Sequence, residues 1–96
     1  MRPSLALALK RDQVLALVAA RGASRPRVFG SVARGQDHDG SDVDLLVDMP
    51  AGTSLLQIAG LQIDLRDALG FDVDLCTERE LHPELRGRIL AEARDL

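Results

Sequence analysis

Three short stretches of the chain carry the hydrophobic residues typical of β-strands. Residues 27–29 and 42–48 are rich in Val, Leu and Phe, and residues 71–76 alternate between apolar and polar side chains. A loop rich in Asp and Gly joins the first two stretches, and Pro50 follows the second, where proline cannot continue a central ladder. The short connection predicts that the first two strands are antiparallel, whereas the third arrives only after a helix.

Three other stretches repeat their apolar residues at a helical period. The first runs from Ser4, a candidate N-cap, to about residue 20. The second begins at residue 53 or 54 and ends at residue 69, where Gly70 closes it. The third begins near Pro83, which suits the first turn of a helix, just after the capping-box spacing of residues 77–80.

The helix predicted to end at residue 69 has one face that is apolar except for Gln62. Two further apolar residues, Leu56 and Ile63, lie off that face and either widen the core or belong to a partner interface. The face itself is formed by Leu55, Ile58, Gln62, Leu65 and Leu69.

The elements follow one another in the order α-β-β-α-β-α, which predicts an α/β (α+β) protein. We expect a small mixed β-sheet flanked by helices. The chain has 96 residues, of which 46% are hydrophobic, so we expect residues 1–96 to form one globular domain with one core.

The charge and the cysteine content limit which partners the chain could bind and in which cellular compartment it could function. The net charge is -3 and no basic block is present, which argues against direct binding of nucleic acid. The single cysteine, Cys76, excludes an internal disulfide and fits a reducing compartment. The apolar run at residues 5–9 is too short to span a membrane, so we expect a cytoplasmic protein without a membrane partner.

Candidate chemistry gathers around the turn between the first two strands. Gly30 and Ser31 follow the first strand and offer backbone N–H groups and a hydroxyl, which suit a phosphate. Asp42 and Asp44 are two residues apart, so in a strand their side chains share a face. The two carboxylates repel each other, and a bound divalent cation removes that repulsion. A phosphate-binding turn beside paired carboxylates is typical of sites for Mg²⁺-dependent phosphoryl or nucleotidyl transfer.

A third acid, Asp74, lies between apolar residues of the third predicted strand, where an unpaired carboxylate would be costly. If that strand lies beside the second, Asp74 joins the pair as a third metal ligand. Asp72 shares its face and is the alternative ligand. An isolated Asp-x-Asp is more often a pair of solvated acids, but the Gly-Ser turn upstream and the strand acid downstream favour a site.

Taken together these motifs resemble the nucleotidyltransferase superfamily that includes DNA polymerase beta. The small size resembles its minimal nucleotidyltransferase (MNT) branch, the antitoxins encoded beside HEPN-domain ribonuclease toxins. The resemblance runs from residue 28 to about residue 96. It rests on Gly30-Ser31-x-x-Arg34-Gly35, then Ser41-Asp42-x-Asp44-Leu45, then Val73-Asp74-Leu75.

The resemblance implies binding roles for residues of the Gly-Ser turn. Gly30 and Ser31 would hold the β- and γ-phosphates of ATP. Arg34 would neutralise phosphate charge, although a salt bridge to the acidic loop is an equally open role. ATP rather than GTP is implied by the family alone, because no aromatic residue suited to reading a base is evident.

The resemblance also implies the reaction. Asp42 and Asp44 would bind two Mg²⁺ ions, and Asp74 would share one of them and help to deprotonate the acceptor hydroxyl. The implied activity is transfer of AMP from ATP to a hydroxyl, often a tyrosine, of a HEPN-domain toxin, which silences the toxin.

Two rival functions stay open at this point. The chain could neutralise its toxin by complex formation alone, with a vestigial site. A small-molecule nucleotidyltransferase is disfavoured, because such enzymes usually carry a further domain for the acceptor. The sequence identifies neither the acceptor residue nor the number of AMP groups, and it leaves a hetero-oligomer and a homodimer both open.

Overall fold

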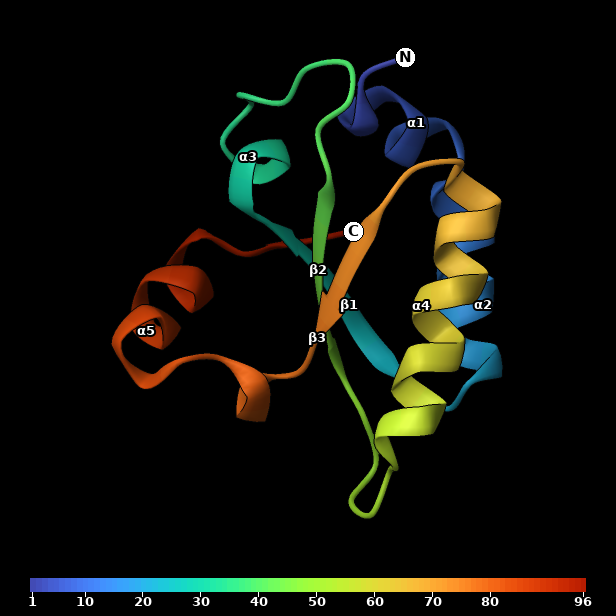
Figure 1. Ribbon diagram of the computed structural model, residues 1–96, viewed down its shortest axis with the longest axis vertical. Coiled ribbons are helices and arrows are strands. Elements are labelled where there is room, and N and C mark those ends of the chain that lie inside the picture. The colour runs from blue at the N-terminus through green and yellow to red at the C-terminus, as the bar shows by residue number, and fades with distance from the viewer.

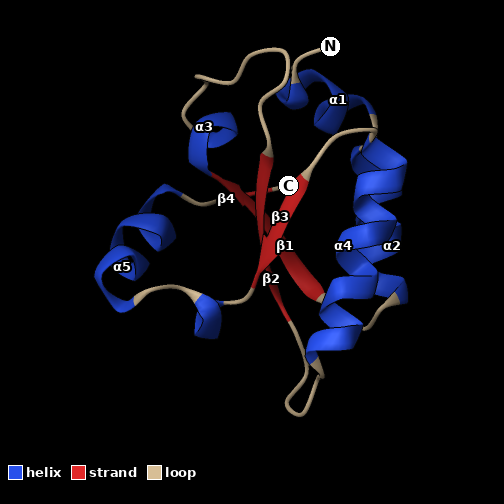
Figure 2. Cartoon of the chain, viewed as in Figure 1, coloured by secondary structure: helices blue, strands red, loops and turns tan.

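A computed structural model describes residues 1–96 as a four-stranded mixed sheet with helices on both sides (Figures 1 and 2). The strand order is β3-β2-β1-β4. β1 is antiparallel to β2 and to β4, whereas β2 and β3 are parallel. The strands are β1 Ser24–Phe29, β2 Val43–Asp48, β3 Val73–Cys76 and β4 Arg94–Asp95.

The helices form two groups around this sheet. Figure 1 shows α2 and α4 side by side on one face of the sheet, and α5 on the other side. None of the helices is long and apolar enough to cross a membrane. They are α1 Pro3–Leu9, α2 Arg11–Ala20, α3 Gly30–Ala33, α4 Leu55–Leu69, the short 3₁₀ helix η1 Glu78–Glu80 and α5 Pro83–Glu92.

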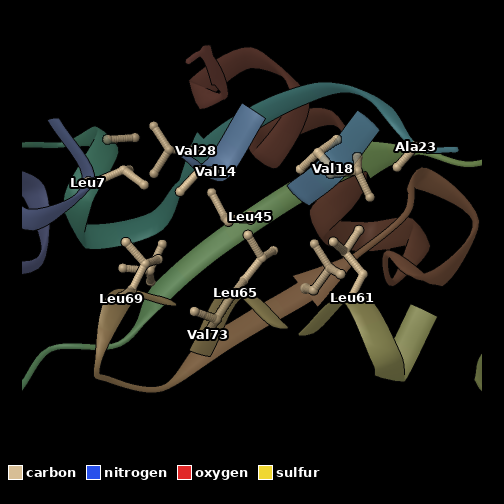
Figure 3. Close-up of a cluster of buried hydrophobic side chains, with 14 residues drawn as sticks. Leu7, Val14, Val18, Ala23, Val28, Leu45, Leu61, Leu65, Leu69 and Val73 are labelled. Atoms are coloured by element: carbon tan, nitrogen blue, oxygen red, sulfur yellow. The ribbon is translucent and has the colours of Figure 1, made fainter. Parts of the chain in front are cut away.

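The core lies between the sheet and the pair of helices α2 and α4 (Figure 3). Val14 and Val18 of α2 and Leu61 and Leu65 of α4 are all buried against the sheet, with Leu45 between them. β2 is buried on both faces, because its residues 43 and 45 to 47 are all fully buried. The central strand is therefore the most constrained element of the fold.

The predicted fold class is confirmed, and so is the antiparallel pairing of the first two strands. The parallel pairing of β3 with β2 follows from the intervening helix α4, which crosses from one strand to the next. The fourth strand, β4, was not predicted. It is only two residues long, too short to show any alternation.

The prediction of one continuous first helix is wrong. Two helices, α1 and α2, meet at Lys10, whose φ of -107° and ψ of 17° depart from helical geometry. Ser4 is not the N-cap, since Arg2 takes that position and Pro3 occupies the first turn. Instead the backbone N–H of Ser4 donates to Asp37 Oδ2 at 2.8 Å. The first turn of α1 is thus capped by a carboxylate distant in sequence, which the local pattern did not reveal.

The long helix α4 is confirmed, with Ser54 as its N-cap in a capping box and Gly70 in the left-handed conformation at its end. Its buried face differs from the predicted one, because Leu61 is fully buried whereas Leu55 is 74% exposed. Gln62 interrupts the apolar face for a structural reason: its Oε1 accepts a hydrogen bond from the Leu75 N–H at 3.2 Å.

Leu56 and Ile63 do not widen the core, since both side chains are exposed. Together with Leu55 they leave an apolar surface on the outer side of α4.

Asp37 fastens the loop between α3 and β2 to the N-terminal helix. Its side chain is buried, and it accepts hydrogen bonds from the Ser4 N–H and from Arg2 Nη2, at 2.8 and 3.1 Å. Burial alone would raise the pKa of Asp37, but the hydrogen bonds from Ser4 and the charge of Arg2 outweigh it and lower the pKa.

We expect Asp37→Ala to lower the free energy of unfolding by about 1–2 kcal/mol, because it leaves the first turn of α1 uncapped. Urea denaturation followed by circular dichroism measures this loss. Asp39→Ala is the matched control, since Asp39 lies in the same loop with its side chain 81% exposed. Equal losses for the two variants would contradict a specific role for Asp37.

Candidate active site

The turn that follows β1 is in close contact with the second strand. Gly30 has a φ of +72°, and its α-carbon lies directly against the carboxylate of Asp44, so that a Cβ at this position would overlap Asp44 Oδ2. The register of β1 and β2 produces this approach, because Phe29 pairs with Asp44 across the antiparallel ladder. Any larger residue here would be strained by the positive φ and would have to displace the Asp44 carboxylate, so glycine allows the backbone of the turn to lie beside it.

The structure brings the three predicted acids to neighbouring positions. Asp42 immediately precedes β2, Asp44 lies within β2, and Asp74 lies on β3 as the register partner of Asp44. Adjacent strands are about 4.8 Å apart, so the Asp44 and Asp74 side chains leave the sheet next to each other. Asp44 is half-buried, whereas Asp42 and Asp74 are exposed.

The electrostatics of Asp44 reflect this arrangement. Burial, and then the negative charges of Asp74 and Asp42, raise the pKa of Asp44 to about 6. Arg34 opposes the rise, and Glu92 adds a smaller contribution to it. The site accumulates negative charge that a cation would relieve.

Asp72, the alternative third acid, lies outside this pairing. It precedes β3, and its backbone carbonyl accepts a hydrogen bond from the Val43 N–H at 3.1 Å. Its side chain is exposed, and it is not among the charges that raise the pKa of Asp44. The register therefore sets Asp74, and not Asp72, opposite Asp44.

The donor set has the chemistry of a Mg²⁺ site but not the closed geometry of one. Carboxylate oxygens are the ligands that this hard cation prefers. No group of three or more His, Cys, Asp or Glu side chains is drawn together closely enough to enclose a metal ion. Like charges repel in the absence of a cation, and the exposed side chains of Asp42 and Asp74 have room to rotate toward Asp44. We judge that the residues fit the metal.

Arg34 forms its salt bridge with Glu92 and not with an acid of the loop, which it contacts only through Gln36 Oε1, the acceptor for its Nε at 3.2 Å. Its Nη1 donates to both carboxylate oxygens of Glu92, at 3.0 and 3.2 Å. The same carboxylate accepts a hydrogen bond from the Gly30 N–H at 2.6 Å. Sequence reasoning missed Glu92, because it lies far along the chain at the end of α5 and belongs to no local motif. Ser31 is half-buried in the first turn of α3, next to this contact.

Cys76 does not add a nucleophile to the site. Burial, with smaller contributions from carboxylates such as Asp74, raises the pKa of its thiol to about 12. At neutral pH it is therefore a thiol rather than a reactive thiolate.

A cavity of about 500 Å³ lies elsewhere, at the opposite end of β2 from the acids. It is lined by residues 47–53 and 77–80 with Leu55 and Ile58 of α4.

Comparison with known families decides the class of this arrangement. The family model of the nucleotidyltransferase domain matches residues 17–96. This chain belongs to the nucleotidyltransferase domain family. The resemblance found from the three sequence motifs is thereby confirmed.

Known members of the family extend the comparison. This nucleotidyltransferase domain is 38% identical over 86 residues to MJ0435 of Methanocaldococcus jannaschii, a protein provisionally named as a protein adenylyltransferase. That match covers 90% of this chain and 92% of MJ0435. A solved structure provisionally described as a minimal nucleotidyltransferase shares 47% identity, with a TM-score of 0.85, over 97% of this chain and 95% of that one.

A second solved structure is a toxin–antitoxin with AMP-PNP. It shares 23% identity with this nucleotidyltransferase domain, at a TM-score of 0.76, over 88% of this chain and 69% of that one. At this level of identity the likeness shows a common fold alone.

We expect Gly30→Ala to destabilise the protein more than Gly35→Ala does. Both glycines have positive φ, but an added Cβ meets nothing within 4 Å at Gly35, whereas at Gly30 it overlaps Asp44. Gly35→Ala costs about 1–2 kcal/mol of backbone strain, and overlap adds about 1–3 kcal/mol at Gly30. Urea denaturation measures both. In an Asp44→Ala background the difference should vanish, and its persistence there would contradict the proposed contact.

We expect Asp44→Asn to stabilise the protein at neutral pH and not at about pH 4. The folded-state pKa of Asp44 is raised from 3.8 to about 6, so its contribution to stability is present below about pH 4 and is lost as the pH rises through about 6. Solvent screening of the half-buried carboxylate reduces the expected gain to about 1 kcal/mol above pH 7.

Thermal unfolding at about pH 4 and about pH 7.5, without divalent cations, measures this gain as a shift of roughly 4–8 °C in Tm. The exposed Asp72 provides the control variant Asp72→Asn. A gain for Asp44→Asn that is the same at both pH values would show that ionisation of this carboxyl is not its cause.

Proposed function

We propose that this chain is a Mg²⁺-dependent protein adenylyltransferase that transfers AMP from ATP to a hydroxyl group of a HEPN-type toxin. The observation that carries the proposal is the pairing of Asp44 with Asp74 on adjacent strands, with Asp42 just before β2. The backbone of Gly30 lies directly beside the Asp44 carboxylate. Membership of the nucleotidyltransferase domain family supports the reaction class, and the name of MJ0435 supports protein as the acceptor.

We assign each residue the role that the resemblance to the nucleotidyltransferase superfamily implies, and its position in the structure supports that role. The backbone of Gly30 and Ser31, with the Arg34 guanidinium, binds the β- and γ-phosphates of ATP. Asp42, Asp44 and Asp74 would hold two Mg²⁺ ions. When bound, Mg²⁺ would neutralise negative charge on the attacking and leaving oxygens.

The acid on β3 also handles the proton. Asp74 is exposed at the edge of the site, so the acceptor hydroxyl can approach it. As the hydroxyl oxygen bonds to the α-phosphorus, Asp74 accepts its proton, and the bond from that phosphorus to pyrophosphate breaks.

A toxin partner is supported by a fold neighbour and by the sequence motifs. The neighbour of known structure with AMP-PNP is a toxin–antitoxin, and the motifs resemble the MNT antitoxins. We propose a tyrosine of the toxin as the acceptor, as the resemblance to the MNT antitoxins implies. The modified toxin would be inactive.

Intact mass spectrometry tests the activity. The HEPN-type protein encoded beside this chain is incubated with it, ATP and Mg²⁺, and we expect a mass gain in AMP-sized steps. Asp42→Ala/Asp44→Ala should abolish the gain. Omitting Mg²⁺ or adding a chelator should abolish it as well.

Single substitutions separate the roles of Asp74 on β3 and of Asp72 just before it. Asp74→Ala should slow AMP transfer by roughly 10²–10⁴-fold, since it removes both a metal ligand and the proton acceptor. Asp72→Ala is the matched control and should keep the rate within about threefold of wild type, because Asp72 precedes β3 and is not among the charges that shift the pKa of Asp44. A larger loss of rate for Asp72→Ala than for Asp74→Ala would show that Asp72, and not Asp74, is the third acid of the site.

The exposed apolar surface of α4 favours a second candidate, neutralisation by complex formation alone. Leu55 and Leu56 are 74% and 83% exposed, which suits contact with a partner protein. Survival of toxin neutralisation in cells carrying Asp42→Ala/Asp44→Ala, with the complex intact, would favour this candidate over catalysis. If the toxin neither gains mass nor forms a complex with this chain, the acceptor should be sought among small molecules that carry a hydroxyl group.

A further inference from the structure

The carboxylate of Glu92 occupies the place where an anion would bind. It accepts hydrogen bonds from the Gly30 N–H at 2.6 Å and from Arg34 Nη1 at 3.0 and 3.2 Å. These are one backbone donor and one guanidinium, a combination suited to a phosphate oxygen. The Glu92 side chain is only 18% exposed, so it lies within the site rather than over it.

The same donors are those that the proposed function assigns to the phosphates of ATP. A carboxylate and a phosphate oxygen cannot both accept the Gly30 N–H at hydrogen-bond distance, because each would occupy the same position. Arg34 is engaged only in part, since its Nη1 donates to both oxygens of Glu92 whereas its Nη2 makes no hydrogen bond. Binding of a phosphate oxygen at the Gly30 N–H therefore requires Glu92 to leave that donor.

The segment that carries Glu92 is held in a way that allows such a movement. Glu92 is the last residue of α5, a helix with no fully buried residue. Beyond it, β4 pairs with β1 over two residues, Arg94 and Asp95. Leu96 then anchors the end of the chain, because its N–H donates to the Pro26 carbonyl at 3.1 Å and its side chain packs against the core. A helix with few buried contacts opens at a lower free energy than the core does. Figure 1 shows α5 apart from the pair of helices that covers the core.

We propose that Glu92 is an intramolecular competitor for the phosphate groups of the nucleotide, which closes the binding turn when no nucleotide is present. This inference rests on the proposed function for the assignment of Gly30 and Arg34 to phosphate. It adds a conformational change to that function. In the free protein Glu92, at the end of α5, is bound to the turn that contains Gly30, and ATP binding displaces it.

The competition predicts that removing the negative charge of Glu92 strengthens nucleotide binding. The affinity of a site that is open only part of the time is reduced by the open fraction. If the turn is open about one-tenth of the time, Glu92→Gln should bind ATP roughly tenfold more tightly. A role in merely orienting Arg34 predicts the reverse, because the guanidinium would lose its support.

Isothermal titration calorimetry with ATP, inorganic tripolyphosphate and adenosine, each in the presence of Mg²⁺, tests the inference. Glu92→Gln should bind ATP and tripolyphosphate roughly tenfold more tightly than wild type, with no change for adenosine, which has no phosphate. Glu84→Gln is the matched control, since it removes the same charge from an exposed position of the same helix. It should leave all three affinities unchanged.

A second variant keeps the test independent of folding defects in the first. Glu92→Asp retains the charge but shortens the side chain, so it should reach Gly30 poorly and should also bind ATP more tightly. Equal or weaker binding of ATP by both variants would overturn the competition while leaving the proposed function standing. Failure of ATP to bind to wild type and variants alike would overturn both proposals.

Discussion

The contact between the Asp44 carboxylate and the α-carbon of Gly30 is the constraint on which the site depends. It fixes the distance between the turn after β1 and the acids of β2, and it exists only because residue 30 has no side chain. The antiparallel register that pairs Phe29 with Asp44 sets this contact, and the parallel register with β3 then places Asp74 beside it. Two strand pairings and one glycine thus assemble groups that lie far apart in sequence.

Three carboxyl groups, those of Asp42, Asp44 and Asp74, concentrate negative charge at one place in the fold. The pKa of Asp44 is raised because the fold half-buries this carboxyl and places two others near it. A protein under selection for stability alone would replace at least one of these acids, since each repels the others. The cost is accepted where a cation or a polar ligand is to be bound.

Much of the fold could be predicted from the sequence because its signals are local. The alternation in residues 71–76, the Ser54 cap and the Gly70 end of α4 each depend on neighbours within one or two turns. The break at Lys10 could not be predicted, because the cap of α1 comes from Asp37, remote in the chain. β4 is too short to carry a pattern, and it depends on β1 for its formation.

Part of the candidate site could likewise be predicted from local sequence signals, and part could not. Gly30, Ser31, Asp42 and Asp44 lie close together along the chain, and their spacing alone predicted shared faces and a shared turn. The sequence alone could not place Asp74 rather than Asp72 opposite Asp44, because that placement depends on the register of β3 with β2. The ion pair of Arg34 with Glu92 joins the turn to the last helix, and no short-range pattern could indicate it.

The buried Asp37 has a consequence for the loop that separates the turn from the acids. This loop runs from residue 34 to residue 42, and Asp37 pins it near its middle to the first helix. One long, flexible connection is thereby divided into two short ones, and the conformational entropy of the loop is lost when the protein folds. A ligand that binds across the turn and the acids then meets a span that is already set, so that ordering this loop does not weaken its affinity.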